Sequence, residues 1–576
     1  MKNDRGNKPG KKTAKLKHFW GKRWLGSLIL GIIPVFTAVP ATAAERVMFN
    51  YGPLLLEIEV SSLEQFAKEG KINRELAFYM KRVDEPTREA FRMALNRRQE
   101  VNAIELYRFF KTPMGEEMLD RIGNFVTIPG GRNGKYAIRA AIGKAAFDRK
   151  EGLTLLNFLR QFPTDIYLDI DRIFELADSV GGLVAETDRV VGQIEQLSLK
   201  EAKSDGIIDY SQLPDLRSAG QYEYSIQTLN VFDRLRNRKF EVDIYKPTAL
   251  REGKTPVIVA SHGLASNRKH FEKIARHLTS YGYVVAVPEH IGSNYTHFTD
   301  MLEGLNRSIF DLNAFIDRPK DVSFVLDELE RRNQREFQGK LDLERVGVLG
   351  HSFGGYTALA LAGAEINFEQ LEKDCDREMW SPNLSLLLQC QAIKLPRQTY
   401  NLRDPRVGVV MVVNPVNSTI FGQKSLSSIE IPLMFASGSD DPATPAVIEQ
   451  VQSFTWLTNQ DRYLLLLEGQ AHLDVSELDA GATQIIESVT ALKFPQPGLI
   501  DRYDNAMTLG FFEYHLANNR EYRPYLQSSY TKYLSEEPFG LYMVQSLSSQ
   551  KKLQETIAQF NTQEKRDRPK RERDPS

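Results

Sequence analysis

From about residue 222 the sequence alternates between short apolar runs and helical stretches, and this alternation limits the fold more than any other feature. The runs are rich in β-branched residues, as in "PVIVAS" at 256–261 and "YVVAVP" at 283–288, and stretches such as "KHFEKIARHL" follow them. Short apolar strands that alternate with helices form a mostly parallel sheet covered on both faces. Two earlier runs, 222–232 and 239–247, predict an antiparallel hairpin. The sequence therefore predicts an α/β domain over residues 215–520.

The motif "GHSFGGY", residues 350–356, lies where one of these strands ends and a helix begins. The pattern G-x-S-x-G often arises by chance, but here "RVGVL" precedes it and "YTALALAG" follows it. A serine on so sharp a strand-to-helix turn is strained and exposes its hydroxyl group. Glycine is needed at positions 350 and 354 because side chains there would collide with the adjoining strand and helix. This context predicts that Ser352 is a nucleophile.

A serine nucleophile needs a base, and an acid orients that base. Of the nine histidines, His472 in "EGQAHLD" directly follows the last predicted strand, where the chain order serine, acid, histidine puts the base. The acid should follow the strand "IPLMFASGS", and two adjacent candidates, Asp440 and Asp441, stand there. The spacing D-x-x-x-P, counted back from Pro445, selects Asp441.

Backbone N–H groups from two places should bind the negatively charged oxygen of the reaction intermediate. One is the N–H of Phe353, directly after the predicted nucleophile. The other should lie in the loop "SHGLAS" after an earlier strand, and we assign it to Leu264. Gly263 gives this backbone the freedom to turn the N–H of Leu264 inward.

Three stretches together, "SHGLASNRKHF", "YVVAVPEH" and "GHSFGGYTAL", resemble the platelet-activating factor acetylhydrolases of the α/β-hydrolase superfamily. The resemblance covers about residues 222–515. It implies the α/β-hydrolase fold and a calcium-independent serine esterase that removes short acyl groups, with the same triad and the same two N–H donors. The chain departs from that family in two places. An insertion occupies residues 365–404, and the region ahead of the sheet resembles a domain of unknown function found before bacterial hydrolases.

The leading hypothesis is an exported serine esterase that hydrolyses short-acyl esters, including esters of phospholipid-like alcohols, through an acyl-enzyme. A polyester hydrolase or a dienelactone-type hydrolase would use the same triad with a different pocket. A different class is a non-catalytic envelope interaction protein with a vestigial hydrolase domain. The complete triad in the correct chain order favours an enzyme. No motif indicates a cofactor or a metal ion. The expected partner is a small-molecule or lipid ester. Peripheral membrane contact is left open.

The N-terminus has the pattern of an export signal. Residues 2–23 hold nine Lys and Arg and a single acid, and the apolar run "WLGSLILGIIPVFTAV" and the small residues "ATA" at 41–43 follow. The run is short for a membrane span and contains Pro34. We therefore predict a signal peptide over 1–43 and a periplasmic or secreted protein, with a retained anchor as the alternative.

Removal of this segment would leave an acidic chain. Lys plus Arg falls from 74 to 65 and Asp plus Glu from 75 to 74, so the formal net charge is near −9. An acidic exported protein is a poor candidate for binding nucleic acid.

The chain has two cysteines, Cys375 and Cys390, and both lie in the insertion. An isolated pair in an exported protein favours a disulfide. Two thiols without nearby histidines are too few for a structural zinc site. A leucine-rich run beside Cys390, "NLSLLLQC", either rims the pocket or packs on the sheet.

The region ahead of the sheet, residues 44–200, is predicted to be all-helical and to pack on the rest as a separate domain. Ser61 and Glu64 have capping-box spacing, and Thr112 followed by Pro113 is typical of a helix start. No His, Cys or acidic cluster here has the spacing of a metal site or a triad.

The C-terminal end is predicted in two parts. Residues 521–563 are expected to form a helical segment. Residues 564–576, "EKRDRPKRERDPS", carry many charges and no apolar side chains, and we expect a disordered tail.

Overall fold

The computed structural model describes residues 43–51, 54–81, 83–375, 382–472 and 498–567. In these residues nine strands form the main sheet, in the order β14-β13-β12-β11-β10-β8-β9-β7-β6. The strands are β6 (Tyr224–Asp233), β7 (Arg238–Pro247), β8 (Thr255–Ser261), β9 (Val284–Pro288), β10 (Leu341–His351), β11 (Val407–Val413), β12 (Leu433–Gly438), β13 (Arg462–Leu467) and β14 (Leu541–Val544). Strands β8 to β13 run parallel, and β6, β7 and β14 pair antiparallel at the two edges.

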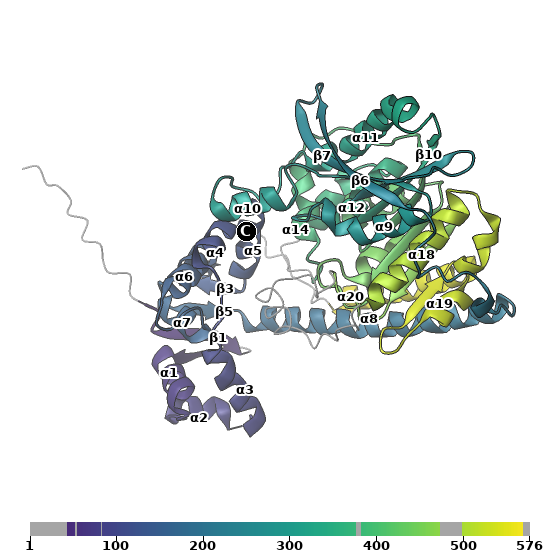
Figure 1. Ribbon diagram of the computed structural model, residues 1–576. Helices are drawn as coiled ribbons and strands as arrows, with labels where there is room; N and C mark the ends of the chain where they lie inside the picture. The colour runs from purple at the N-terminus through teal and green to yellow at the C-terminus, as the bar shows by residue number, and fades with distance from the viewer. Residues whose placement is uncertain (1–42, 52–53, 82, 376–381, 473–497, 568–576) are drawn as a thin grey trace, which may run out of the picture. The chain divides into compact units, whose positions relative to one another are not determined.

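Helices cover both faces of this sheet (Figure 1). One face packs against α11 (Ala314–Glu336) and α12 (Phe353–Ala362), and the other against α9 (Glu272–Ser280) and α18 (Leu499–His515). Strand β8 is buried along its whole length, because helices cover both faces of the sheet. The α/β fold expected from the alternating pattern, with its antiparallel hairpin β6–β7, is confirmed.

Shorter helices connect these layers. They are η1 (Tyr210–Gln212), η2 (Arg268–Phe271), α10 (Tyr295–Glu303), α15 (Ser418–Leu426), the π-helix η4 (Val447–Val451) and α16 (Gln452–Trp456). Among them, α15 and η4 follow β11 and β12 at the carboxyl ends of the parallel strands, where an open α/β sheet has its binding site.

The N-terminal domain is not all-helical, so that prediction is wrong. Its helices are α1 (Val60–Glu69), α2 (Arg74–Met80), α3 (Glu85–Asn96), α4 (Ala103–Phe109), α5 (Pro113–Gly123), α6 (Lys135–Phe147) and α7 (Leu155–Gln161). Within the described residues they pack with a second sheet in the order β2-β1-β5-β3-β4. Its strands are β1 (Arg46–Tyr51), β2 (Leu54–Glu59), β3 (Val126–Ile128), β4 (Arg132–Asn133) and β5 (Ile166–Leu168).

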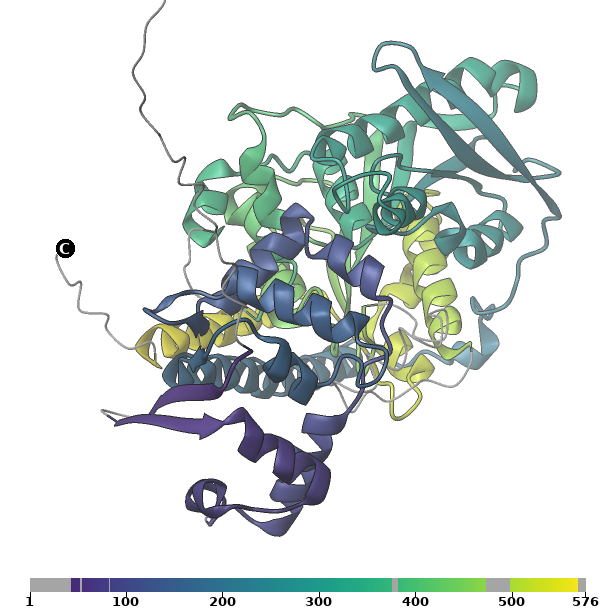
Figure 2. The ribbon, with the colours of Figure 1, turned by 90° about the vertical axis from the view of Figure 1, so that its left-hand side faces the viewer.

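The physical reason for this error differs between the strands. Strands β1 and β2, the purple arrows in Figure 2, form an antiparallel hairpin with Arg46 opposite Glu59. The sequence "LEIE" in β2 alternates apolar and acidic residues, which is a strand pattern that the helical reading overlooked. Strands β3, β4 and β5 have two or three residues each and exist only through pairing, which no local pattern reveals.

The two predicted helix starts in this domain have different outcomes. Thr112 caps α5, since its hydroxyl group accepts a hydrogen bond from the N–H of Gly115 at 3.0 Å, and Pro113 is the first helical residue. The capping box at Ser61 is not formed. Helix α1 already begins at Val60, and the hydroxyl group of Ser61 donates to Glu59 instead.

A long helix, α8 (Ile170–Ser204), follows the N-terminal domain and packs against the main sheet domain. Its residues Leu183, Val190 and Ile194 are part of the same buried core as the strands of the main sheet. Near its end, the hydroxyl group of Ser198 accepts a hydrogen bond from the N–H of Met543 in β14 at 3.1 Å.

The C-terminal segment 521–563 is not purely helical. It contains the end of η6 (Arg520–Leu526), then α19 (Ser528–Leu534) and α20 (Leu547–Asp567), and between these two helices it adds the edge strand β14 to the main sheet. The four residues of β14 are too few to show a strand pattern by themselves. Of the predicted tail, residues 564–567 continue α20 and the rest lie outside the described residues.

The insertion 365–404 folds as α13 (Phe368–Cys375), α14 (Leu386–Gln389) and the 3₁₀ helix η3 (Cys390–Lys394). Cys375 and Cys390 form the predicted disulfide, with Cα atoms 5.6 Å apart. Most of the leucine run packs inward. Leu386 and Leu388 are buried, whereas the side chain of Leu384 is 41% exposed.

The double substitution Cys375→Ser and Cys390→Ser is expected to lower the free energy of unfolding by about 3 kcal/mol, because the disulfide closes a loop of 15 residues that would otherwise be free in the unfolded chain. Urea unfolding of the variant and of the oxidised wild type measures the difference. The reduced wild type is the control and should unfold like the variant. Equal stability of the oxidised wild type and the variant would contradict the expectation.

The predicted signal peptide, residues 1–43, lies outside the described residues except for Ala43. In the part of the chain that the structure covers, no helix is long and apolar enough to cross a membrane.

Candidate active site

Ser352 occupies a sharp turn between β10 and α12, near the middle of the main sheet. Its φ of 55° and ψ of −116° are strained for a residue with a side chain. The glycines of the motif permit the turn. A Cβ on Gly350 would lie 2.1 Å from the carbonyl oxygen of Gly354, and a Cβ on Gly354 would lie 1.8 Å from that of Ser261. The sequence around Ser352 therefore folds into the strand–turn–helix expected for a nucleophile.

His472 lies beside Ser352 although 120 residues separate them. The loop that follows β13 brings its Nε2 to 2.9 Å from the Oγ atom of Ser352. The imidazole can accept the hydroxyl proton from there, because this distance lies within the reach of a general base.

The carboxylate that contacts His472 belongs to Asp441, in the loop after β12. Its Oδ2 atom lies 2.6 Å from Nδ1 of His472, and the residue is 3% exposed. The same carboxylate accepts hydrogen bonds from the N–H groups of Ala443 and Thr444 and from the hydroxyl group of Thr444, at 2.7 to 2.9 Å. Asp440 is exposed, and it accepts a hydrogen bond from Ser439.

These three side chains form a continuous hydrogen-bonded chain from hydroxyl to imidazole to carboxylate. Since a carboxylate can only accept, Nδ1 of His472 carries the proton and Nε2 presents its lone pair to the hydroxyl group. This arrangement can activate a serine for attack on a carbonyl carbon.

The two predicted N–H donors lie close to the nucleophile. The N–H of Phe353 belongs to the first residue of α12, directly after Ser352. The loop that holds Leu264 is also near, since a Cβ on Gly263 would lie 3.3 Å from Cβ of Ser352. Neither the N–H of Leu264 nor that of Phe353 donates a hydrogen bond to another described residue. Both therefore stay candidate donors for a substrate oxygen.

His351, inside the motif, has a role that sequence reasoning missed. Its Nε2 donates a hydrogen bond to the backbone carbonyl oxygen of His472 at 2.9 Å, so it holds the main chain of that residue. Burial, with smaller effects of His270 and His472, keeps the pKa of His351 well below its usual value, and the ring is neutral. Its place directly before Ser352 was the only available signal.

His262 stabilises the loop that contains Leu264 through two hydrogen bonds. Its Nδ1 donates to the carbonyl oxygen of Gly263 at 2.8 Å, and its Nε2 accepts the N–H of His290 at 3.1 Å. Burial, followed by the nearby Arg318 and His290, holds the pKa of His262 well below its usual range. The ring is therefore a neutral structural link.

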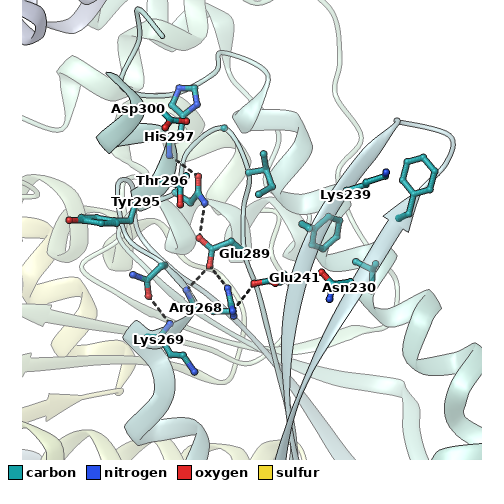
Figure 3. A pocket seen from close by; sticks show the side chains of 17 residues that line it. Asn230, Lys239, Glu241, Arg268, Lys269, Glu289, Tyr295, Thr296, His297 and Asp300 are labelled. Carbon is teal, nitrogen blue, oxygen red and sulfur yellow. Dashed lines mark hydrogen bonds and ion pairs between the residues drawn. The ribbon is translucent and has the colours of Figure 1, made fainter. Parts of the chain in front are cut away.

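A cavity of about 760 Å³ opens between the hairpin β6–β7 and the loop after β9 (Figure 3). Its wall carries Arg268, which forms ion pairs with Glu241 at 2.7 Å and Glu289 at 3.4 Å. None of the three triad side chains lines it. The candidate reactive site at Ser352 is therefore separate from this cavity.

No group of three His, Cys, Asp or Glu side chains in the described parts of the chain could hold a metal ion. The absence of a cofactor stays a prediction.

Comparisons with known proteins bear on the fold and on the class of reaction. The family model "Chlorophyllase" matches residues 214–372, which contain the motif of Ser352. The family model "Alpha/beta hydrolase of unknown function (DUF1400)" matches residues 43–169, which form the N-terminal domain ahead of the main sheet. The chain carries an α/β-hydrolase domain. Its main sheet, the strand–turn–helix at Ser352 and the first of these matches agree on this point.

Two curated proteins are similar to part of this chain. A putative esterase, YitV of Bacillus subtilis (strain 168), is 25% identical over 199 residues, which cover 34% of this chain and 72% of the relative. The platelet-activating factor acetylhydrolase of Cavia porcellus is 27% identical over 147 residues, which cover 20% of this chain and 33% of the relative. The match thus spans a third of the length of the acetylhydrolase.

Proposed function

We propose that the protein is an exported serine hydrolase that cleaves short-acyl carboxylic esters through an acyl-enzyme. The observation that carries the proposal is the hydrogen-bonded chain from Ser352 through His472 to Asp441. The names of the two relatives, a putative esterase and an acetylhydrolase, support an ester as the substrate. The disulfide and the signal-like N-terminus support export.

The proposed acylation step uses these groups in a fixed order. The Oγ atom of Ser352 attacks the ester carbonyl carbon while Nε2 of His472 takes the hydroxyl proton. The carbonyl oxygen becomes negatively charged and accepts hydrogen bonds from the N–H groups of Leu264 and Phe353. Asp441 stabilises the imidazolium. The intermediate then collapses, and His472 gives its proton to the departing alcohol.

Deacylation repeats the sequence with water as the nucleophile. His472 takes a proton from the water molecule, and the resulting hydroxide attacks the acyl carbon. The same two N–H groups hold the second oxyanion, and collapse releases the acid while Ser352 regains its proton from His472.

The insertion supports a restricted acyl pocket, because it is fastened near the reactive site. The buried carboxylate of Glu449, in η4, accepts hydrogen bonds from Ser385 of the insertion at 2.6 Å and from the N–H of Ser418 in α15 at 2.9 Å. Just ahead of α15, the N–H of Val416 donates to the carbonyl oxygen of Ser352 at 3.2 Å. We expect an insertion held so close to the nucleophile to limit the length of the acyl chain.

The alcohol side of the substrate is proposed to be lipid-like. Two apolar side chains of the insertion, Leu384 and Ile393, are 41% and 37% exposed. They offer apolar contact to a lipid alcohol or to the surface of a membrane.

Hydrolysis of p-nitrophenyl esters from acetyl to octanoyl tests the proposed substrate class. We expect kcat/KM to fall steeply as the acyl chain grows, since each methylene that does not fit costs about 1–3 kcal/mol. The Ser352→Ala variant is the control for uncatalysed hydrolysis. A flat or rising profile would point to a lipase or polyester hydrolase pocket. Hydrolysis of dienelactone alone would favour the dienelactone-type alternative, and both results would contradict the short-acyl proposal.

A further inference from the structure

Arg318, in α11, is a fully buried arginine behind the proposed oxyanion site. Its Nη1 donates to the hydroxyl group of Ser293 at 2.8 Å, and its Nε to that of Thr357 at 3.1 Å. Its Nη2 donates to the backbone carbonyl oxygen of His262 and lies 3.5 Å from the hydroxyl group of Ser261. All of these acceptors are neutral groups.

No carboxylate contacts this guanidinium within the described chain. Two acids of the same helix lie close along the chain, and both are already paired: Asp317 forms ion pairs with Arg236 at 3.2 Å and Arg238 at 3.4 Å, and Asp321 is bound by the same two arginines. Arg238 donates to both oxygens of Asp321 at 2.9 and 2.8 Å, and Arg236 forms an ion pair with it at 2.9 Å. Burial lowers the pKa of Arg318 to about 9, while Asp321 raises it, so the group is charged at neutral pH. A positive charge without a directly bound anion is therefore fixed in the interior.

The guanidinium of Arg318 contacts both parts of the chain that supply the proposed oxyanion donors. The guanidinium carbon lies 4.6 Å from the ring centroid of Phe353, whose N–H is one donor. The carbonyl oxygen of His262, to which Nη2 donates, lies two residues before Leu264, whose N–H is the other donor. One side chain thus connects the helix start after Ser352 with the loop after β8.

We propose that Arg318 is a positioning residue for the oxyanion site: it fixes His262 and Phe353, and its positive charge, which no carboxylate of the described chain contacts directly, favours the negatively charged intermediate over the neutral substrate. The inference rests on the proposed esterase function. Donors and charges that are held in place before the reaction stabilise a developing oxyanion without reorganisation, and they act strongly where water is excluded.

The test compares binding of an oxyanion with binding of a neutral ester. A trifluoromethyl ketone accepts the serine oxygen at its carbonyl carbon, the serine proton passes to His472, and the carbonyl oxygen becomes an oxyanion. For Arg318→Gln we expect the inhibition constant of this ketone to rise and kcat for p-nitrophenyl acetate to fall, each about 10- to 100-fold, with KM within about threefold of wild type. Arg318→Lys keeps the charge and should recover part of the loss.

Arg462→Gln is the matched control, because Arg462 is also a buried arginine but lies at the start of β13, away from the carboxyl ends of the strands. It should change neither the inhibition constant nor kcat. If Arg318→Gln does not fold, Ser293→Ala and Thr357→Val each remove one acceptor of the guanidinium. Each should then raise the inhibition constant about threefold, by partial loss of the positioning contacts.

Two results would overturn the inference by itself. The first is that the wild type is active and that Arg318→Gln has the same ketone affinity and the same kcat. If Arg318→Gln does not fold, the same result for both Ser293→Ala and Thr357→Val counts instead. The other is equal losses for Arg318→Gln and Arg462→Gln. A folded wild type that neither hydrolyses esters nor binds the ketone would overturn the proposed function and this inference with it.

Discussion

Replacement of Ser352 by alanine is expected to lower kcat/KM for p-nitrophenyl acetate by about 10⁴-fold or more, because the substitution removes the Oγ atom on which the proposed acyl-enzyme forms. The fold should persist, since alanine removes only the Oγ atom from the strained turn and the hydrogen bond to His472. Initial rates measured with wild type and variant at equal concentration check the activity, and thermal unfolding checks the fold.

Ser528→Ala is the matched control for this substitution. Ser528 is buried like Ser352, but it begins α19 and donates a hydrogen bond to the carbonyl oxygen of Met543. Its variant should retain wild-type activity. A Ser352→Ala protein that keeps more than a few per cent of the rate would show that a different group carries the reaction.

Replacement of Asp441 by asparagine should have the second largest effect, a loss of roughly 10³- to 10⁴-fold in kcat. The amide cannot stabilise the imidazolium, and it favours the tautomer of His472 that has its proton on Nε2, where it no longer accepts the serine proton. Asp440→Asn is the natural control, because Asp440 is the neighbouring residue and its carboxylate is exposed. It should stay within about twofold of wild type, as is usual for exposed sites.

Kinetics of both variants on one ester, with circular dichroism to verify folding, measure the difference. The reverse order of effects would contradict the assignment of Asp441. Equal and small effects would mean that no carboxylate in this loop supports His472.

The main domain could be predicted from sequence because its signals are local. Buried parallel strands are continuous apolar runs, as in β8 and β9, and the motif of Ser352 needs its glycines next to the turn that they permit. The N-terminal sheet and the edge strand β14 could not be predicted in this way. Their strands are short, and pairing partners far along the chain define them.

The same distinction holds within the candidate site. The spacing of Asp441 and the position of His472 after a strand are visible in the sequence, and the structure brings His472 to Ser352 and Asp441 to His472. The supporting contacts are not visible. His351 holds the main chain of His472, and Arg318 reaches His262 from a helix 56 residues away, so these contacts exist only in the folded chain.

Labelling with a fluorophosphonate tests most directly whether Ser352 is a live nucleophile. The intact, folded protein is treated with the probe, digested and analysed by mass spectrometry. We expect one covalent adduct per chain, on the peptide that contains Ser352, with no adduct on the Ser352→Ala variant and loss of ester hydrolysis in step with labelling. A folded wild type that takes up no probe, or takes it up on another residue, would contradict the proposed mechanism and favour a protein whose hydrolase domain only binds.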